Sequence, residues 1–430
     1  MQTPEPVIVY KEKYGKTGLF KSIVEYPDLN TDNYPYQLKR QFITKELKIL
    51  NNTHIGIKLN PVFCEAFINK SFKSPYLNTA EYVTVQNGTI VLFFNEAVSD
   101  FHRSGRNNFS RIKQWIKSVV KGIVQLHLGR ILHGDISASN ILIFNSMAKL
   151  SDFGSSALIL DNNYQHFTSR LYKPTHRAPE VWRSSQWNLS ADMWALGCTI
   201  YEMIYGMLLF QVKNTNEEYI NQINSWCDPN NISENFEISS EWNNPIYEKA
   251  NKLILKLLRV NPSERPTIFD VLKDPFFEDD SYVSLSSSPE SISLLRDSDL
   301  SNIKDDVKQC NYELLKDCPI IARRVYDKNN FNNDQRVVNM YKKLQIYESD
   351  REIKLLVICM YHELINMNLK INFEITTLLL IVHLLVHRDT PRLLTITRET
   401  INEIINISLA VDFKYIPWNK FYGIYERFIY

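Results

Sequence analysis

The chain has 430 residues, a formal net charge of +1 at neutral pH, 44% hydrophobic residues and 23% charged residues. This length and composition are those of a globular protein with two domains, or with one large domain and an appendage. The near-zero net charge argues against nucleic-acid binding as the main function and predicts no general attraction to membranes.

Strands are expected early in the chain, at Pro6–Tyr10, Leu19–Tyr26 and the wholly apolar Ile90–Phe94. Phe42–Leu50 is predicted as a short amphipathic helix that carries Glu46. A small β-rich unit is therefore expected at the amino-terminal end.

Helices are expected to dominate further along the chain. Phe109–His127 has apolar residues at helical spacing over a wide face, and Met193–Tyr205 is predicted as a buried helix. Residues 278–306 are rich in Ser and Asp, which predicts a flexible linker. Four helical patterns follow the linker, at Gln335–Tyr347, Arg351–Met367, Phe373–Arg388 and Thr397–Phe413.

Six scattered cysteines, none in a Cys-x-x-Cys pair, favour reduced and buried thiols over a disulfide or zinc framework. The first six residues are polar and contain proline, so we expect no secretory signal. The longest apolar run, Leu378–Val386, is far shorter than the ~20 residues that span a bilayer. A soluble, intracellular protein of the cytoplasm or nucleus is expected, with no membrane partner.

The segment Ile131–Gly154 contains the residues most suited to chemistry. Asp135 and Asn140 are five positions apart, an apolar hairpin follows, and Asp152-Phe153-Gly154 closes the segment. Phosphoryl transfer needs one carboxylate to receive a hydroxyl proton, and an amide plus a second carboxylate to hold Mg²⁺ over the phosphates. The spacing therefore predicts Asp135 as catalytic base and Asn140 and Asp152 as metal ligands.

This segment, followed by Ala178-Pro179-Glu180 and Ser190–Gly197, resembles the protein kinase family, nearest its cyclin-dependent branch. The resemblance implies an α+β, bilobal kinase domain at 1–277, with an N-lobe of about 1–94 and a C-lobe of about 99–277. It also implies ATP and Mg²⁺ as cofactors, and transfer of the γ-phosphoryl group to Ser/Thr hydroxyls of protein substrates. Asp192 is expected to bind the backbone of the catalytic loop, and Arg265 to form a buried ion pair with Glu180.

The same resemblance implies where the nucleotide binds. Gly15 and Gly18 would form a turn whose backbone amides can approach the phosphates closely. Lys39 would contact those phosphates. Glu46 would hold Lys39 by an ion pair, although only six residues separate the two, about half the usual number or fewer. The rest of the predicted nucleotide site comprises Phe94, Glu96, Ala97, Asp100 and Leu142.

The catalytic loop departs from the family pattern H-R-D-L-K-x-x-N at two positions, with Gly134 for Arg and Ser137 for Lys. Ser137 belongs to the predicted catalytic set, but the lysine usual at its position neutralises charge on the transferred phosphoryl group. Lys173 replaces a threonine that usually bridges the activation loop and the catalytic Asp. Thr168 lies where the cyclin-dependent branch has a phosphothreonine, yet Gly134 removes the arginine that would bind that phosphate.

Several alternatives follow from these departures. The H-G-D-x-S/T-x-x-N form also resembles small atypical kinases, which lack Ala-Pro-Glu. A pseudokinase scaffold is the main alternative from another class, given the sparse glycine turn, the short Lys39 to Glu46 spacing and Ser137.

Residues 307–430 are predicted as an all-α domain where a regulatory partner could bind. This domain is either a plain bundle packed on the kinase or a partial cyclin box. In the cyclin-like case the kinase carries its own activator, or the chain is an interaction protein with an inert lobe.

Overall fold

The computed structural model describes residues 7–14, 19–25, 40–48, 62, 64–70, 72, 74–86, 89–104, 108–145, 147–159, 165–167, 171–227 and 239–278. In the carboxy-terminal region it describes residues 343, 353–354, 357, 377–379 and 381–382. Four residues singled out in the sequence lie outside these ranges: Gly15, Gly18, Lys39 and Thr168. Among the residues described, no helix is long and apolar enough to cross a membrane.

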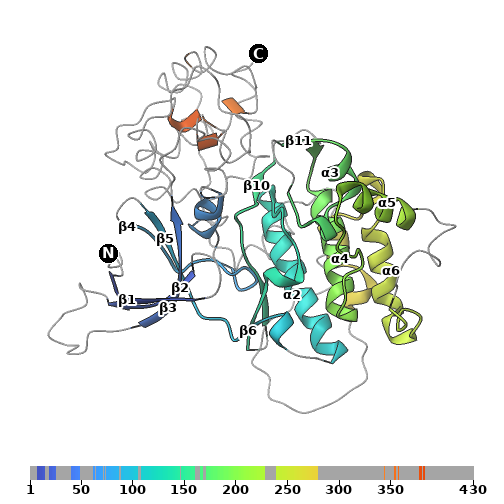
Figure 1. Cartoon of the computed structure of the whole chain (residues 1–430), viewed down its shortest axis with the longest axis horizontal. Helices are drawn as coiled ribbons and strands as arrows, with labels where there is room; N and C mark the ends of the chain where they lie inside the picture. Colours follow the sequence, from blue (N-terminus) through green and yellow to red (C-terminus); the bar gives the residue numbers. More distant parts are fainter. Residues whose placement is uncertain are drawn as a thin grey trace, which may run out of the picture.

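A five-stranded antiparallel sheet forms a small amino-terminal lobe, with strand order β1-β2-β3-β5-β4 (Figure 1). The predicted strands at Pro6–Tyr10, Leu19–Tyr26 and Ile90–Phe94 are confirmed. The five strands are β1 (Val7–Lys13), β2 (Leu19–Glu25), β3 (Arg40–Lys48), β4 (Tyr82–Gln86) and β5 (Thr89–Phe94).

The predicted helix at Phe42–Leu50 is wrong, because this stretch is the central strand β3. β3 is hydrogen-bonded to β2 on one edge and to β5 on the other. Phe42 and Thr44 are buried on one face and Ile43 and Leu47 on the other. The β-branched residues suit an extended backbone, and pairing on both edges overrides the helical tendency of the charged residues that follow.

One helix of the small lobe, at 64–70, was not among the predicted elements. It lies between the sheet and the large lobe (Figure 1). Cys64, Ala66 and Ile68 are buried in the main hydrophobic core. This helix therefore connects the sheet to the rest of the core.

The large lobe is mostly helical, and the predicted helices at Phe109–His127 and Met193–Tyr205 are confirmed. Its helices are α2 (Phe109–Leu128), α3 (Pro179–Arg183), α4 (Ser190–Tyr205), α5 (Asn216–Cys227), α6 (Glu248–Leu257) and α7 (Ile268–Leu272). The 3-10 turns are η2 (His102–Ser104), η3 (Ala138–Asn140), η4 (Pro174–His176), η5 (Pro245–Tyr247), η6 (Pro262–Glu264) and η7 (Pro275–Phe277). Its short strands are β6 (Ser99–Asp100), β7 (Ile131–Leu132), β8 (Ile141–Phe144), β9 (Met147–Leu150), β10 (Ala157–Leu158), β11 (Gln165–His166) and β12 (Gln186–Trp187).

Helix α2 leads the chain into the segment of interest. It begins at Asn108, whose side chain accepts a hydrogen bond from the Arg111 N–H at 2.8 Å, and its apolar face packs on β7, β9 and α7. The apolar hairpin predicted after Asn140 is confirmed as β8 and β9. Residues 133–140 are thus held between a helix end and a hairpin.

Helix α4 is buried on nearly all sides. At Gly197 a Cβ would lie 2.9 Å from the Leu258 side chain, so this glycine lets α4 approach the end of α6 closely. A helix packed this tightly is a rigid base for the side chains at its amino-terminal end.

Apolar residues from the carboxy-terminal region belong to the same hydrophobic core as the two lobes. Ile353, Val357, Leu378, Leu379 and Val382 are each 0% exposed and all lie in helical backbone. The predicted helix at Thr397–Phe413 lies outside the described residues.

Candidate active site

Asp135 and Asn140, which the sequence places five positions apart, are in direct contact. The Asn140 side-chain amide donates to the Asp135 carboxylate and to the Asp135 main-chain carbonyl, both at 2.8 Å. Asn140 ends the 3-10 turn η3, and its own carbonyl accepts from the main chain of Ser151 at 2.9 Å. The carboxylate of Asp135 is therefore oriented by a side chain that is itself tied to the residue before Asp152.

His133 holds the beginning of this loop, as a packing and hydrogen-bonding residue. Its Nδ1 accepts from the Asp135 N–H and its Nε2 contacts the Ser151 carbonyl, both at 3.2 Å. A carbonyl only accepts, so the ring is neutral with its proton on Nε2. Complete burial lowers the pKa of His133 despite nearby carboxylates, which keeps this neutral form in place.

Asp192, at the start of α4, binds the loop backbone, as the sequence predicted. Its carboxylate accepts from the N–H groups of His133 at 2.8 Å and Gly134 at 3.1 Å. It also contacts His127 Nε2 at 2.9 Å and accepts from the Tyr172 hydroxyl at 2.9 Å. Burial alone would raise the pKa of Asp192, but the hydrogen bonds and His127 hold it below its ordinary value.

The local backbone explains why position 134 is a glycine. Its φ is +77°, and a Cβ there would lie 2.3 Å from the Ser155 carbonyl oxygen. Its own carbonyl accepts from the Tyr172 N–H at 2.7 Å. Only glycine fits this backbone between two neighbouring segments without strain.

Lys45 joins the small lobe to Asp152. Its Nζ lies 2.6 Å from Glu65 Oε1 on helix 64–70 and 3.3 Å from Asp152 Oδ1. Burial lowers the pKa of Lys45, but the carboxylates of Glu65 and Asp152 raise it above its ordinary value. Burial would likewise raise the pKa of Asp152, yet Lys45 lowers it, so Lys45 stays a cation beside a carboxylate.

Asp152 has a backbone φ of +66°, in the left-handed region that few non-glycine residues adopt. Its carboxylate also accepts from the Gly154 N–H at 3.5 Å. Backbone in this region is commonly held in place at functional sites by surrounding contacts. Lys45 provides such a contact here.

The structure describes only one member of the predicted pair of Lys39 and Glu46. Glu46 lies on strand β3 and not on a helix, and its side chain binds Lys11 at 2.5 Å. Lys39 lies outside the described residues. Lys45 and Glu65 were missed in the sequence because they are 20 positions apart, and the helix that carries Glu65 had not been identified. A carboxylate among the apolar residues Cys64, Ala66 and Ile68 was the available signal.

The remaining predicted nucleotide-site residues lie on β5, β6 and β8 and on the chain between β5 and β6. Phe94 is buried at the end of β5, and Asp100 on β6 is paired with Leu142 on β8. Ala97 is half-buried, and the exposed Glu96 accepts from Gln41 at 2.8 Å. The structure brings Asp100 and Leu142 together, whereas Glu96 contacts the sheet.

Arg265 and Glu180 form the predicted buried ion pair. The guanidinium binds both carboxylate oxygens, at 2.6 and 2.7 Å, and also donates to the Ser190 carbonyl at 2.9 Å. The pair fixes the segment that ends at α3 to the beginning of α4 and to the chain before α7. Both side chains therefore have a structural role.

Ser137 is buried on the same loop, and the Lys173 ammonium donates to its hydroxyl at 2.8 Å. The structure thus places a cation from a distant segment on the loop that carries Asp135 and Asn140.

The residues present fit Mg²⁺ with a nucleotide. Among the described residues no group of three or more His, Cys, Asp or Glu could hold a metal ion by itself. Mg²⁺ takes few protein ligands and shares phosphate oxygens, so the carboxylate of Asp152 and the amide oxygen of Asn140 suffice. The amide nitrogen of Asn140 is already committed to Asp135, which leaves its oxygen for a cation.

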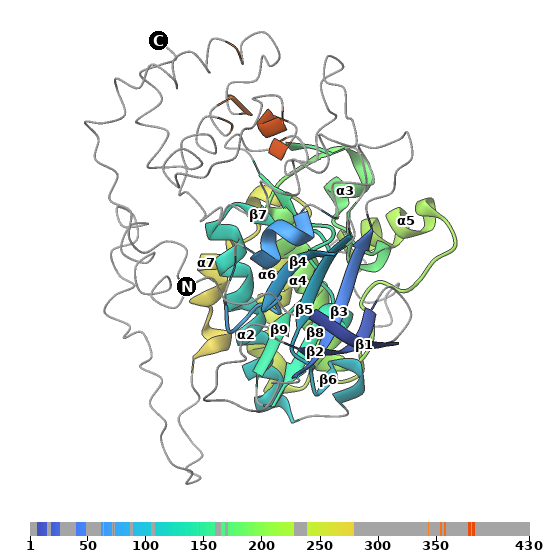
Figure 2. The same cartoon turned by 90° about the vertical axis from the view of Figure 1, so that its left-hand side faces the viewer.

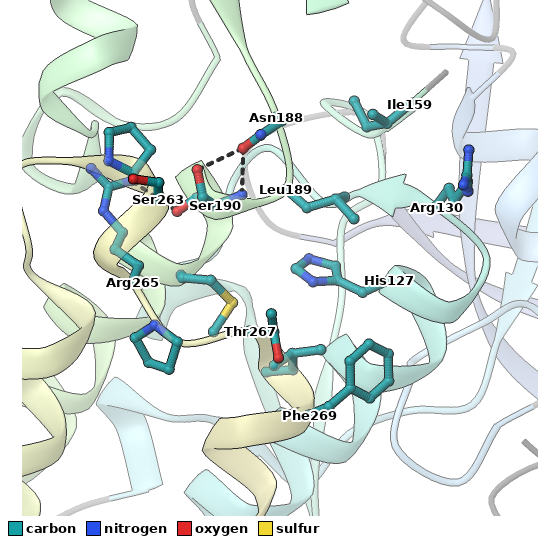
Figure 3. Close-up of a pocket in the computed structure, with 14 residues that line it drawn as sticks. His127, Arg130, Ile159, Asn188, Leu189, Ser190, Ser263, Arg265, Thr267 and Phe269 are labelled. Atoms are coloured by element: carbon teal, nitrogen blue, oxygen red, sulfur yellow. Dashed lines mark hydrogen bonds between the residues drawn. The ribbon is translucent and has the colours of Figure 1, made fainter. Parts of the chain in front are cut away.

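A separate pocket of about 390 Å³ lies between α2, α4 and the segment before α7 (Figure 3). Two of its lining side chains are already engaged, His127 with Asp192 and Arg265 with Glu180. Asn188 there accepts from the Ser190 hydroxyl at 2.6 Å. None of the predicted site residues lines this pocket, so we assign it no part in the chemistry.

Comparison with known proteins identifies the family to which the chain is similar. A family model described as "Protein kinase domain" matches residues 37–277. A probable cell cycle serine/threonine-protein kinase CDC5 homolog of Encephalitozoon cuniculi is 31% identical over 179 residues, which is 40% of this chain and 35% of the relative. Serine/threonine-protein kinase Nek5 of Homo sapiens is 30% identical over 170 residues, which is 39% of this chain and 22% of the relative.

Serine/threonine-protein kinase PLK4 of Danio rerio is 28% identical over 206 residues, 47% of this chain and 20% of the relative. The chain thus covers between 20% and 35% of the length of these relatives. Their names give no support to the predicted affinity with the cyclin-dependent branch or to a cyclin box.

Proposed function

The chain belongs to the protein kinase family, and from that premise we propose that it transfers the γ-phosphoryl group of Mg-ATP to Ser/Thr hydroxyls of protein substrates. The observation that carries this proposal is the series of contacts from Glu65 through Lys45 to Asp152. It places a cation and the carboxylate of Asp152 together across the two lobes. The Ser/Thr preference is supported by the names of the relatives.

Each residue of the site has a proposed role. Asp135, oriented by Asn140, positions the substrate hydroxyl and accepts its proton. Lys45 binds phosphate oxygens while Glu65 holds its ammonium in place. Asp152 and Asn140 hold Mg²⁺, which when bound neutralises charge between the phosphates. Phe94, Ala97, Asp100 and Leu142 would contact the adenosine.

A pseudokinase scaffold remains the second candidate, and Ser137 is the residue that favours it. The two candidates are distinguished by labelled-phosphate transfer from Mg-ATP to a generic basic protein. We expect incorporation by the unmodified chain and a loss of at least about 100-fold in Asp135→Ala, since a general base contributes that much. Stabilisation by Mg-ATP in thermal unfolding should persist in Asp135→Ala.

Absence of incorporation by the unmodified chain, with Mg-ATP still raising its unfolding temperature, would favour the scaffold. Asp152→Ala serves as the second variant, because it should lose both incorporation and Mg²⁺-dependent stabilisation.

The carboxy-terminal region is proposed to act on the kinase domain of the same chain. Both views draw its described segments on the side of the molecule where helix 64–70 lies (Figures 1 and 2). Val357 and Leu379 are fully buried and share one hydrophobic cluster with Cys64 and Ile68 of that helix. Because this helix carries Glu65, packing within the shared cluster would bear on the ion pair with Lys45. Residues 307–430 are accordingly proposed as a helical unit, joined by the linker at 278–306.

An intracellular location, in the cytoplasm or nucleus, is also proposed. The thiol of Cys198 is free and buried, which suits a reducing compartment.

A further inference from the structure

The catalytic loop receives a lysine from a segment 36 positions downstream. The Lys173 ammonium donates to the Ser137 hydroxyl at 2.8 Å and also to the Ser139 hydroxyl. These two hydroxyls are 3.1 Å apart and lie between Asp135 and Asn140 in sequence. Lys173 therefore reaches the part of the loop that carries both functional side chains.

The backbone on the amino-terminal side of Lys173 is held firmly. The Tyr172 N–H donates to the Gly134 carbonyl at 2.7 Å, and the Tyr172 hydroxyl donates to Asp192 at 2.9 Å. Tyr172 has a φ of +65°, a conformation that costs free energy for an aromatic residue and persists only where contacts fix it. The Lys173 side chain therefore extends from backbone that is anchored to the catalytic loop itself.

The carboxy-terminal side of Lys173 is held as well. Pro174 begins η4, and the Arg177 side chain donates to the carbonyls of Leu171 at 2.9 Å and Tyr172 at 2.8 Å. A lysine fixed on both sides loses less rotational freedom when its ammonium is placed in one position. The placement is preorganised, as electrostatic catalysis requires.

The partners of the Lys173 ammonium are of a different kind from those of Lys45. Among the described residues, the partners of its ammonium are hydroxyls, whereas Lys45 is paired with Glu65 and Asp152. Hydroxyl oxygens hold an ammonium without cancelling its charge. A full positive charge therefore remains in the loop where a phosphoryl group would be transferred.

We propose that Lys173 is a catalytic residue that neutralises the charge on the transferred phosphoryl group, in place of a lysine at position 137. This inference rests on the proposed kinase activity. In the reaction the bond from γ-phosphorus to the ADP oxygen breaks, and a bond to the substrate hydroxyl oxygen forms. The hydroxyl proton passes to Asp135, and Lys173 stays protonated throughout, exchanging hydroxyl partners for phosphoryl oxygens.

An exchange of the two side chains tests the proposal. Lys173→Met should lower kcat by about 100-fold with little change in the KM for ATP, since loss of one preorganised donor costs that much. The double variant Ser137→Lys with Lys173→Thr returns the charge to the catalytic loop and should recover at least about a tenth of the original kcat. Lys252→Met, at an exposed lysine of α6, is the control and should match the unmodified chain.

Unaltered kcat in Lys173→Met would overturn the proposal. So would an exchange variant as inactive as Lys173→Met with the same unfolding temperature as the unmodified chain. Should the exchange variant fail to fold, Lys173→Arg takes its place, and kcat no higher than in Lys173→Met would count against the proposal.

A binding measurement separates this inference from the kinase activity itself. Mg-ADP with aluminium fluoride resembles the transferring phosphoryl group, and it should raise the unfolding temperature more than Mg-ADP alone. Lys173→Met should abolish this additional rise and leave the effect of Mg-ADP intact. If the unmodified chain transfers no phosphate but shows the Lys173-dependent rise, the proposed function fails and the anion site stands. An additional rise that survives in Lys173→Met contradicts the site.

Discussion

At the scale of single residues, two lysines bring positive charge to the site from different directions. Lys45 comes from the sheet and is held by Glu65, while Lys173 comes from the segment before α3 and is held by two serine hydroxyls. The difference in partners suggests different tasks. Lys45, shared with Asp152, is suited to the phosphates of the bound nucleotide, and Lys173 to the group in transit.

Replacing each candidate lysine of the small lobe by methionine decides which one acts. Lys45→Met should lower kcat/KM for ATP by roughly 100-fold or more, because it removes the cation between Glu65 and Asp152. Lys39→Met is the comparison variant and should retain at least about half of the activity. Steady-state phosphate transfer measures both, and the opposite pattern would return the role to Lys39.

At the scale of secondary-structure elements, helix α4 fixes the backbone of the site through contacts at its amino-terminal end. Asp192 in its first turn binds the loop backbone at His133 and Gly134, and the Ser190 carbonyl accepts from Arg265. The loop and the segment before α3 are thus fixed to one end of one buried helix. This arrangement fixes the positions of Asp135 and Lys173 relative to each other.

The ion pair between Arg265 and Glu180 should be costly to break from one side. Arg265→Met leaves a largely buried carboxylate without its partner, so we expect the free energy of unfolding to fall by about 3–5 kcal/mol. The double variant with Glu180→Met removes both charges and should lose clearly less. Urea unfolding of the two variants and the unmodified chain measures the difference.

Equal losses in the single and double variants would mean that packing, and not the unpaired charge, determines the cost. The matched control is Lys252→Met, which breaks an exposed pair with Glu248 and should change stability by less than about 1 kcal/mol.

At the scale of the whole molecule, the main hydrophobic core extends through both lobes and includes residues of the carboxy-terminal region. Helix 64–70 lies within that core through Cys64, Ala66 and Ile68. If the proposed action in cis holds, packing at the carboxy-terminal end affects the position of Glu65.

Charged substitutions in the carboxy-terminal region test this coupling. Val357→Asp with Leu379→Asp places two carboxylates at fully buried positions, which is unfavourable enough to detach the segments. We expect phosphate transfer to fall by about tenfold and amide hydrogen exchange at 64–70 to accelerate. Lys343→Asp, at an exposed position of the same region, is the control and should change neither.

If activity and exchange at 64–70 both stay unchanged while exchange within the carboxy-terminal segments rises, those segments fold independently of the kinase domain. The proposed action in cis would then be withdrawn.

The sequence by itself determined what is encoded over short distances. Asp135 and Asn140 lie in one loop, a hairpin of fixed length carries the chain to Asp152, and apolar spacing specifies α2 and α4. Local geometry suffices for such features, because few intervening residues leave few conformations to choose from. The pairings of Asp192 with the loop and of Arg265 with Glu180 were predicted by resemblance and are confirmed.

Only the tertiary structure decided the partners of Lys45 and Lys173. Lys45 and Glu65 are 20 positions apart and Lys173 and Ser137 are 36 apart, so neither pair has a periodic signal in the sequence. The position of Lys45 follows from the pairing of β3 with strands on both edges, where a helix had been predicted. The position of Lys173 follows from the contacts of Tyr172 with Gly134 and Asp192. Long-range packing sets these positions and thereby places Lys173 beside Ser137.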